Sequence, residues 1–239
     1  MKKSYILEVP INITTENEII NIIKEKIEQN QKFSIIAINI NKIMLYQKNK
    51  EIAKVIKSFE CFIPDGISVV KACGKLNTRI TGIDLFQKIC KEHEKINARI
   101  FLYGAREEVV NETKQKLEEL YPGIQIVGIK NGFVKEHDEL IQEINHSKAN
   151  ILFIAKGSPK QEKWIYENKD KVNANIFMGV GGAFDIVSGN IRRAPEWIRK
   201  LGLEWLYRIL KEPKKRLKQI PMIAKYWYLI KKEKTSELE

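Results

Sequence analysis

The stretch from residue 150 to 168, NILFIAKGSPKQEKWIYEN, contains the signals of a strand, a turn and a helix in that order. Its apolar run does not alternate with polar residues, which is typical of a strand buried on both faces of a parallel sheet. Gly157 then marks a turn, and we expect a helix from about Pro159 to Asn168. A repeated strand, turn and helix unit predicts an α/β fold.

Working outward from this stretch, similar apolar runs alternate with helical patterns along the chain. The expected strands are 34–40, 61–64, 99–104, 124–129, 150–157 and 175–182, and the other expected helices begin near Thr15, Gly82 and Arg106. We therefore predict a Rossmann-like, mostly parallel sheet flanked by helices. A chain of 239 residues fits one large domain with an appendage. We expect an α/β core over 1–191 and a basic helical appendage over 192–239.

The cysteines and the N-terminal sequence predict a cytoplasmic protein. Cys61, Cys73 and Cys90 form no CxxC pair and lie in apolar segments, where a free thiol acts as a small hydrophobe. The start of the chain is a poor signal peptide, since Glu8 and Pro10 interrupt its short apolar stretch. No run reaches the roughly 18 apolar residues that a spanning helix needs.

The positive charge is concentrated near the C-terminus. The whole chain carries a net charge of +12, and the segment from Arg192 to Lys234 holds fourteen Lys or Arg against four Glu. Such a basic segment predicts an anionic partner, which could be phospholipid headgroups, nucleic acid or a phosphorylated substrate.

Glycine-rich turns follow several of the expected strands: LYGA, AKGSPKQE, GVGGAFD and PDG. In an open parallel sheet, ligands bind at the carboxyl ends of the strands, where glycine lets backbone amides approach a phosphate. The turns therefore indicate a nucleotide or sugar-nucleotide pocket, and the alternative is that they are merely tight connections. Neither GxGxxG nor GxxxxGK[ST] is present.

Three of the five aspartates, Asp65, Asp84 and Asp185, lie near glycine within apolar sequence. Partial burial raises the pKa of a carboxylate and makes it a better base near neutral pH. The alternative for each is a helix cap or an acceptor for turn amides. Because no DxD pair occurs and the histidines lack short-range spacing, we expect neither a metal site nor a cofactor.

Four motifs carry a resemblance to a known family: PDGISVV (64–70), RITGIDL (79–85), GSPKQEKWI (157–165) and the long motif that begins MGVGGAFDIVSGNIRRAPEWI (178–198). In order and spacing they resemble the WecG/TagA/CpsF family of bacterial glycosyltransferases over nearly the whole chain. The resemblance implies an inverting, metal-independent enzyme of teichoic acid or surface polysaccharide synthesis. Such an enzyme transfers N-acetylmannosamine or a related hexose from a UDP donor to a polyprenyl-diphosphate-linked sugar at the cytoplasmic membrane face.

The resemblance also implies roles for individual residues. Asp65 would be the base that deprotonates the acceptor hydroxyl, and a single base is sufficient because direct displacement inverts the anomeric centre. Cationic side chains and amides must then stabilise the departing diphosphate. The expected donor-binding residues are Asn39, Arg79, Gln161, Glu162, Gly181, Gly182 and Asp185. The expected acceptor or diphosphate ligands are Arg192, Arg193, Arg208, Lys214 and Arg216.

The sequence departs from the family pattern in the first core strand. Relatives commonly carry threonine two residues before the asparagine that matches Asn39, and this chain has Ala37. The departure implies an altered sugar preference or weakened activity. Ser68 and Ser158 also replace a frequent glycine and a frequent alanine, and these changes look minor.

The appendage interleaves Trp, Tyr and Leu with Lys and Arg, and its mainly apolar run 222–230 is too short to cross a bilayer. Such segments lie in the headgroup region of an anionic membrane. The alternative is a helical pair that packs on the core or on a second subunit. Two rival functions are a basic, non-catalytic or nucleic-acid-binding protein and a nucleotide-dependent oxidoreductase, but neither has its expected motifs.

Overall fold

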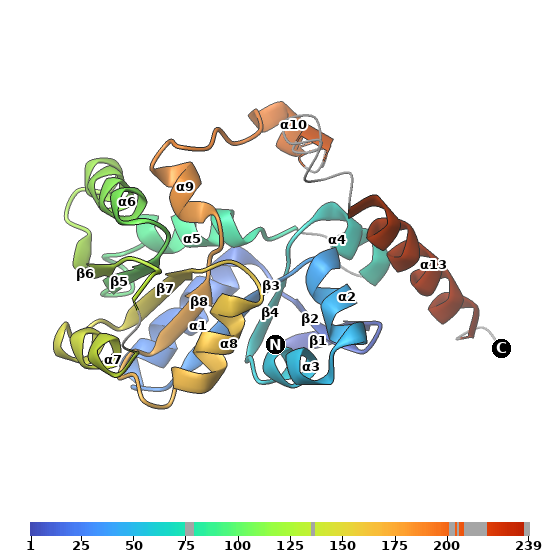
Figure 1. The fold of residues 1–239 in the computed structure, drawn as a ribbon, viewed down its shortest axis with the longest axis horizontal. Coiled ribbons are helices and arrows are strands. Elements are labelled where there is room, and N and C mark those ends of the chain that lie inside the picture. The colour runs from blue at the N-terminus through green and yellow to red at the C-terminus, as the bar shows by residue number, and fades with distance from the viewer. Residues whose placement is uncertain (75–78, 135–136, 201–203, 205, 208–218, 237–239) are drawn as a thin grey trace.

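The computed structural model describes residues 1–74, 79–134, 137–200, 204, 206–207 and 219–236 (Figure 1). The strands are β1 (Lys2–Ile6), β2 (Val9–Ile13), β3 (Phe33–Ile38), β4 (Cys61–Pro64), β5 (Arg99–Gly104), β6 (Gln125–Lys130), β7 (Ile151–Ala155) and β8 (Ile176–Gly179). The helices are α1 (Glu16–Glu28), α2 (Ile40–Lys48), α3 (Lys50–Lys57), α4 (Ile67–Cys73), α5 (Gly82–Lys91), α6 (Glu107–Leu120), α7 (His137–His146), α8 (Lys160–Asn168), α9 (Ala183–Val187), α10 (Glu196–Lys200) and α13 (Ile220–Ser236).

The main sheet has six strands in the order β4-β3-β8-β7-β5-β6, and every neighbouring pair is parallel. Because side chains alternate across a pleated strand, β3 supplies Ile36 and Ile38 to one face and Ile35 and Ala37 to the other. The first face packs against α2, α3, α7 and α8, and the second against α1, α5, α6 and α9. The molecule is therefore a sheet between two helical layers (Figure 1).

The small sheet is an antiparallel hairpin of β1 and β2 that lies beside β4. The buried Asn12 of β2 accepts a hydrogen bond from the Phe62 N–H of β4 at 2.7 Å. The hairpin therefore covers an edge strand that would otherwise present unpaired backbone groups to solvent.

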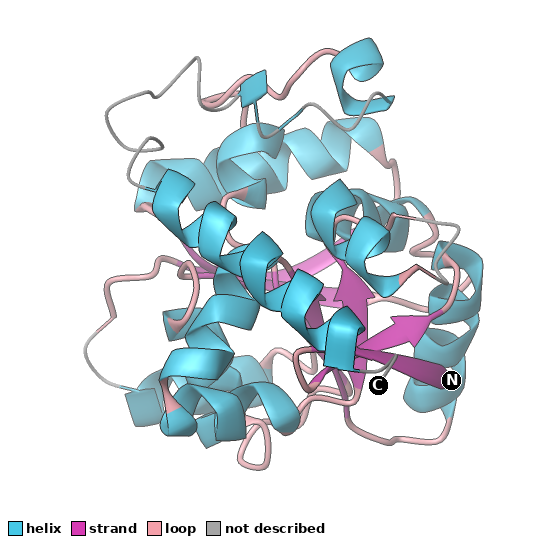
Figure 2. Cartoon of the chain, turned by 90° about the vertical axis from the view of Figure 1, so that its right-hand side faces the viewer, coloured by secondary structure: helices cyan, strands magenta, loops and turns pink. Residues whose placement is uncertain are grey.

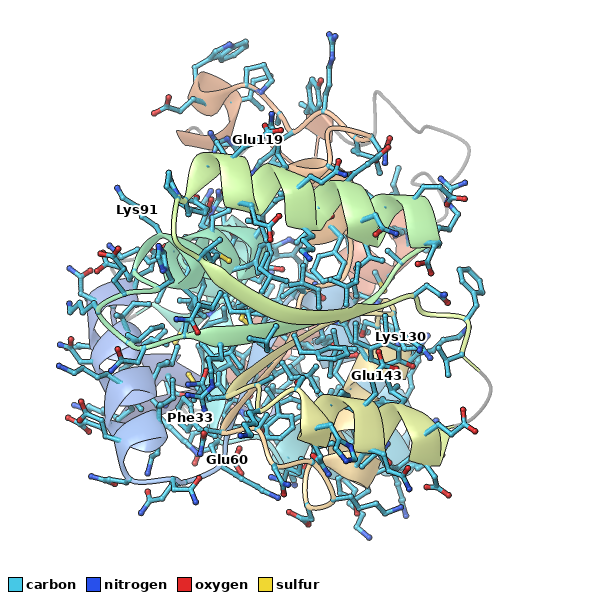
Figure 3. All side chains as sticks on the ribbon, turned by 90° about the vertical axis from the view of Figure 1, so that its left-hand side faces the viewer. Phe33, Glu60, Lys91, Glu119, Lys130 and Glu143 are labelled. Atoms are coloured by element: carbon cyan, nitrogen blue, oxygen red, sulfur yellow. The ribbon has the colours of Figure 1, made fainter. Side chains whose placement is uncertain are left out.

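Polar contacts fix the start of helix α1 and the amino-terminal ends of the strands. At α1, Thr15 and Glu18 form a reciprocal capping box, in agreement with the expected cap. At the amino ends of the strands lies Glu60, which Figure 3 labels near Phe33. Its carboxylate accepts from the Ser34 N–H at 2.7 Å and pairs with Lys169. The exposed Lys130–Glu143 pair, also labelled in Figure 3, links β6 to α7.

Helix α13 lies across one side of the molecule and packs on the same apolar cluster as α2 (Figure 2). Tyr226 is fully buried, and its hydroxyl donates to the Ser68 carbonyl at 3.3 Å. The Glu233 carboxylate accepts from the Leu7 N–H at 2.9 Å. This helix is therefore attached to the core by burial and by hydrogen bonds to distant segments.

The structure confirms the predicted α/β fold with a mostly parallel sheet flanked by helices, and it contains a C-terminal helix. Strands β4 and β5 begin and end where expected, and the ends of the other four expected strands differ by one to three residues. The sequence reasoning did not anticipate the hairpin, α2, α3, α4 or α7. The cysteines are free and buried as expected.

Within the described residues, no helix is both long enough and apolar enough to cross a membrane. The proposed boundary at residue 191 remains a prediction.

Candidate active site

Four strand ends meet at the carboxyl edge of the sheet, because β4, β3, β8 and β7 are consecutive neighbours. After these strands come Asp65, Asn39, Gly181 and Gly157, respectively. The chain leaves β3 through α2 on one face and leaves β8 through α9 on the other (Figure 1). Adjacent strands whose connections diverge in this way form the crevice in which open α/β sheets bind ligands.

Asp65 occupies the turn between β4 and α4. Its N–H donates to the Ile38 carbonyl of β3 at 2.8 Å, which fixes it beside the end of the neighbouring strand. The next residue, Gly66, has φ of 117°, a conformation that L side chains rarely adopt. The Pro-Asp-Gly sequence therefore ends the strand sharply and leaves Asp65 half-buried at the rim of the sheet.

Arg79 is brought to the same edge, since the N–H of the following Ile80 donates to the Pro64 carbonyl at 3.2 Å. Its guanidinium lies 3.9 Å from the Glu204 carboxylate, a long contact between two partly buried groups. Arg79 and Asp65 are thus positioned by adjacent backbone groups at the end of β4.

Asn39 caps α2. Its side-chain oxygen accepts from the Lys42 N–H at 3.1 Å, a hydrogen bond that satisfies one of the unpaired donors of the first turn. The residue follows β3 directly and is half-buried. Ala37, two residues earlier, is buried on the opposite face, where a Cβ on Gly82 of α5 would lie 3.3 Å from its methyl group.

A buried polar network joins Lys42, Gln161, Glu162 and Gly181. The Gly181 N–H donates to Gln161 Oε1 at 3.0 Å, and Gln161 Nε2 donates to Glu162 Oε1 at 3.1 Å. Lys42 Nζ lies 3.3 Å from the same Glu162 oxygen, with only 7% and 4% of the two side chains exposed. In this structure Gln161 and Glu162 therefore bind other parts of the protein, and the Gly181 amide is directed at Gln161.

A second ionic cluster surrounds Asp84 at the start of α5. Arg193 Nη1 lies 2.6 Å from Asp84 Oδ1, Arg199 lies 3.8 Å from the same oxygen, and the Thr81 hydroxyl donates to Asp84 Oδ2 at 2.6 Å. Burial raises the pKa of the Asp84 carboxyl, but hydrogen bonds from Arg193 and Thr81 and the charges of Arg193 and Arg199 outweigh it. The net pKa lies below its ordinary value, so Asp84 is a weak base.

The other expected site residues lie near or beyond this edge. Asp185 is half-buried in α9, and its carbonyl accepts from the Ile191 N–H at 2.8 Å. Gly182 is the N-cap residue of α9 and is exposed, as is Arg192. The remaining expected diphosphate ligands lie outside the described residues: Arg208, Lys214 and Arg216.

The comparisons with known proteins cover almost the whole chain. The model of the glycosyl transferase WecG/TagA/CpsF family matches residues 4–238. An N-acetylglucosaminyldiphosphoundecaprenol N-acetyl-beta-D-mannosaminyltransferase of Bacillus subtilis is 33% identical over 219 residues, which is 89% of this chain and 85% of the relative. A protein of the same name from Bacillus spizizenii is 35% identical over 204 residues, covering 84% and 79%.

The chain belongs to the WecG/TagA/CpsF glycosyl transferase family. The predicted resemblance is therefore confirmed, and the protein is a glycosyltransferase. For a member of this family, Asp65, Asn39 and the turn at Gly181 form the candidate reaction centre, because three adjacent strand ends bring them together. Among the described residues, no cluster of three or more His, Cys, Asp or Glu could hold a metal ion.

Sequence reasoning missed two lysines at this edge. Lys42 lies on the buried face of α2 with Ile43 and Tyr46, and a lysine on an apolar stripe is a signal for a buried ion pair. Lys156, after β7, donates to the Tyr103 hydroxyl at 2.7 Å, and burial raises the pKa of Tyr103 to about 12. Burial and the nearby charge of Lys160 lower the pKa of Lys156.

Proposed function

We propose that this protein transfers N-acetylmannosamine, or a closely related hexose, from a UDP donor to an N-acetylglucosamine linked to polyprenyl diphosphate. The observation that carries the proposal is the family match over residues 4–238 combined with a carboxylate, Asp65, at the carboxyl edge of the sheet. The names of both Bacillus relatives support the choice of donor sugar and acceptor.

In the proposed mechanism, the Asp65 carboxylate removes the proton from the acceptor hydroxyl as its oxygen attacks the anomeric carbon. The bond from that carbon to the diphosphate oxygen breaks in the same step. The configuration at the anomeric carbon is therefore inverted, and UDP departs with the bonding electrons. A donor with an α-linked sugar would thus give the β product that the relatives' name describes.

The negative charge that develops on UDP needs stabilisation without a metal ion. We assign this role to Arg79, whose backbone is fixed beside the end of β4, and to the exposed Arg192. Arg193 fits the role less well, because it is already paired with Asp84 at 2.6 Å. The Gly181 turn would approach the donor with its backbone, as glycine turns at this edge of a sheet commonly do.

We further propose that α13 holds the enzyme at the inner membrane face. The helix turns Tyr226 and Ile230 inward and exposes Trp227 (39%), Tyr228 (67%) and lysines, including Lys225, on its outer side. Aromatic and basic side chains on one helix face suit the headgroup region of an anionic bilayer. A lipid-linked acceptor would bring its reacting sugar to the same surface.

The test of the reaction is a panel of UDP-sugars incubated with a short-chain polyprenyl-diphosphate-linked N-acetylglucosamine, with products identified by mass. We expect transfer of N-acetylmannosamine with formation of a β linkage, and we expect a chelator to leave the rate unchanged. Transfer that requires Mg²⁺ or Mn²⁺ would refute the metal-free mechanism. Absence of transfer from every donor would refute the function.

The membrane proposal needs a separate experiment, because truncation would expose the cluster that Tyr226 covers. The paired substitution Lys225→Gln and Tyr228→Ser changes two exposed positions of the outer side. We expect it to abolish pelleting with vesicles that contain phosphatidylglycerol while the melting temperature stays unchanged. Pelleting equal to that of the unmodified protein would show that this face does not bind the membrane.

A further inference from the structure

The network beneath the Gly181 turn connects three consecutive strand exits. Lys42 belongs to α2, which follows β3; Glu162 and Gln161 belong to α8, which follows β7; and Gly181 follows β8, the strand between them. The contacts run from Lys42 Nζ to Glu162 Oε1, then through the Gln161 amide to the Gly181 N–H. A single chain of polar contacts therefore fixes the relative positions of three segments at the candidate active site.

The ionic part of this network is almost completely removed from water. Only 7% of the Lys42 side chain and 4% of the Glu162 side chain are exposed. Glu162 Oε2 is buried and has no hydrogen-bond partner among the described residues. A buried carboxylate in this state depends strongly on its remaining cation, because removing one partner leaves an uncompensated charge in a medium of low polarity.

Gln161 reaches the turn because β8 has no side chain at its last position. A Cβ on Gly179 would lie 2.5 Å from Gln161 Nε2 and 2.8 Å from Gln161 Cδ, closer than real Cβ contacts. Gln161 is itself buried, so its amide cannot exchange its protein partners for bulk water. The orientation of this amide therefore depends on the acceptor that Glu162 presents to it.

We propose that Lys42 is a positioning residue of the transferase: by balancing the charge of Glu162, it holds the Gln161 amide in the orientation that binds the Gly181 N–H and so fixes the turn that meets the donor diphosphate. The role at the donor rests on the proposed function. Lys42 does not need to touch the substrate. It acts through the side chains of Glu162 and Gln161. Its loss should therefore make the turn at Gly181 less rigid and lower the affinity for the donor.

The experiment compares Lys42→Met with the double variant Lys42→Met/Glu162→Gln. Hydrogen exchange of the peptide that contains Gly181 reports on the turn, and titration calorimetry with UDP reports on the donor site. Lys42→Met should speed exchange at the turn at least tenfold and weaken UDP binding about tenfold, a change of about 1.4 kcal/mol. In the double variant, the exchange rate at the turn and the affinity for UDP should return to within about threefold of those of the unmodified protein. The reason is that the neutral amide oxygen that replaces the carboxylate can still accept from Gln161 without a cation.

Lys163→Met is the matched control, since Lys163 follows Glu162 on α8 but forms a more exposed pair with Glu51 of α3. It should change neither exchange at Gly181 nor UDP affinity. The KM for the lipid-linked acceptor should stay the same in all variants, whereas the KM for the donor should follow the UDP affinity. These readouts separate positioning from a general loss of stability, which would lower the melting temperature without changing affinity well below it.

The proposal is overturned if Lys42→Met leaves exchange at Gly181 and UDP affinity unchanged, or if the double variant recovers neither. Should Lys42→Met alone not fold, the double variant decides: near-normal protection of the turn supports the proposal, and loss of protection refutes it. If the unmodified protein does not bind UDP, the proposed function fails, and the exchange comparison still tests the contact between Lys42 and the turn.

Discussion

Asp65 and Asp84 have similar sequence surroundings and different environments in the folded chain. Both lie close to a glycine within apolar sequence, and both come to the same region of the molecule. Asp84 accepts from Thr81 and pairs with Arg193 and Arg199, which lowers its pKa. Asp65 instead follows a strand directly and is half-buried at the sheet edge. The comparison shows that similar local sequence can place one aspartate in the first turn of a helix and the other directly after a buried strand.

The largest expected effect comes from Asp65→Asn, which removes the proposed base. Turnover should fall by about 10² to 10⁴, the usual contribution of a general base. The melting temperature and UDP affinity should change little, because the amide has nearly the same shape. Asp138→Asn, at an exposed position of α7, is the control. Retained turnover in Asp65→Asn would remove the basis for assigning the two aspartates different roles.

Asp84→Asn should affect stability instead of chemistry. It weakens hydrogen bonds between charged groups and leaves Arg193, whose side chain is 13% exposed, without its counter-ion. We expect the free energy of unfolding to fall by about 1.5–3 kcal/mol, as measured by urea denaturation. Turnover at 20 °C should stay within about threefold of that of the unmodified protein, since this carboxylate has no proposed role in proton transfer. A hundredfold loss of turnover in the folded variant would contradict that assignment.

The pH dependence of the free energy of unfolding should also distinguish the unmodified protein from Asp84→Asn. The folded-state pKa of Asp84 is lowered, so its contribution is fully present above the ordinary aspartate pKa of about 3.9 and is lost as the pH falls through the folded-state value. The stability difference between the unmodified protein and Asp84→Asn should therefore be constant near pH 6 and shrink below about pH 4. A difference that grows as the pH falls would refute the pairing.

The smallest effect should come from Asn39→Ser, which replaces the amide oxygen that caps α2 with a hydroxyl oxygen that can also accept from the Lys42 N–H. Stability should change by only a few tenths of a kcal/mol, because serine and asparagine are nearly equivalent caps. If Asn39 also binds the donor, calorimetry should show UDP affinity reduced about fivefold. Equal UDP affinity would mean that Asn39 is only a cap, which would narrow the proposed donor site to the turn at Gly181 and the arginines.

Local sequence predicted the elements that carry their own signals. The apolar run and glycine turn of 150–168 correctly indicated a buried strand followed by a helix, and Thr15 correctly indicated a cap. The hairpin over residues 2–13 was missed because its formation depends on packing beside β4. The hydrogen bond that Asn12 accepts from the Phe62 N–H is one such contact. Helices α2 and α3 were missed because they are short and their caps, Asn39 and Asn49, were not recognised as caps.

The sequence by itself determined the alternation of strands and helices and the position of Asp65 at a strand end, since each depends on residues that are near one another in the chain. It also determined membership of the family, which depends on the order and spacing of four motifs along the chain. Only the tertiary structure decided that Arg193 neutralises Asp84 and that Lys42 supports Glu162. These partners are separated by more than a hundred residues. Ionic contacts of this kind arise when the sheet brings distant strand exits together, and burial then decides how strongly each charge depends on its partner.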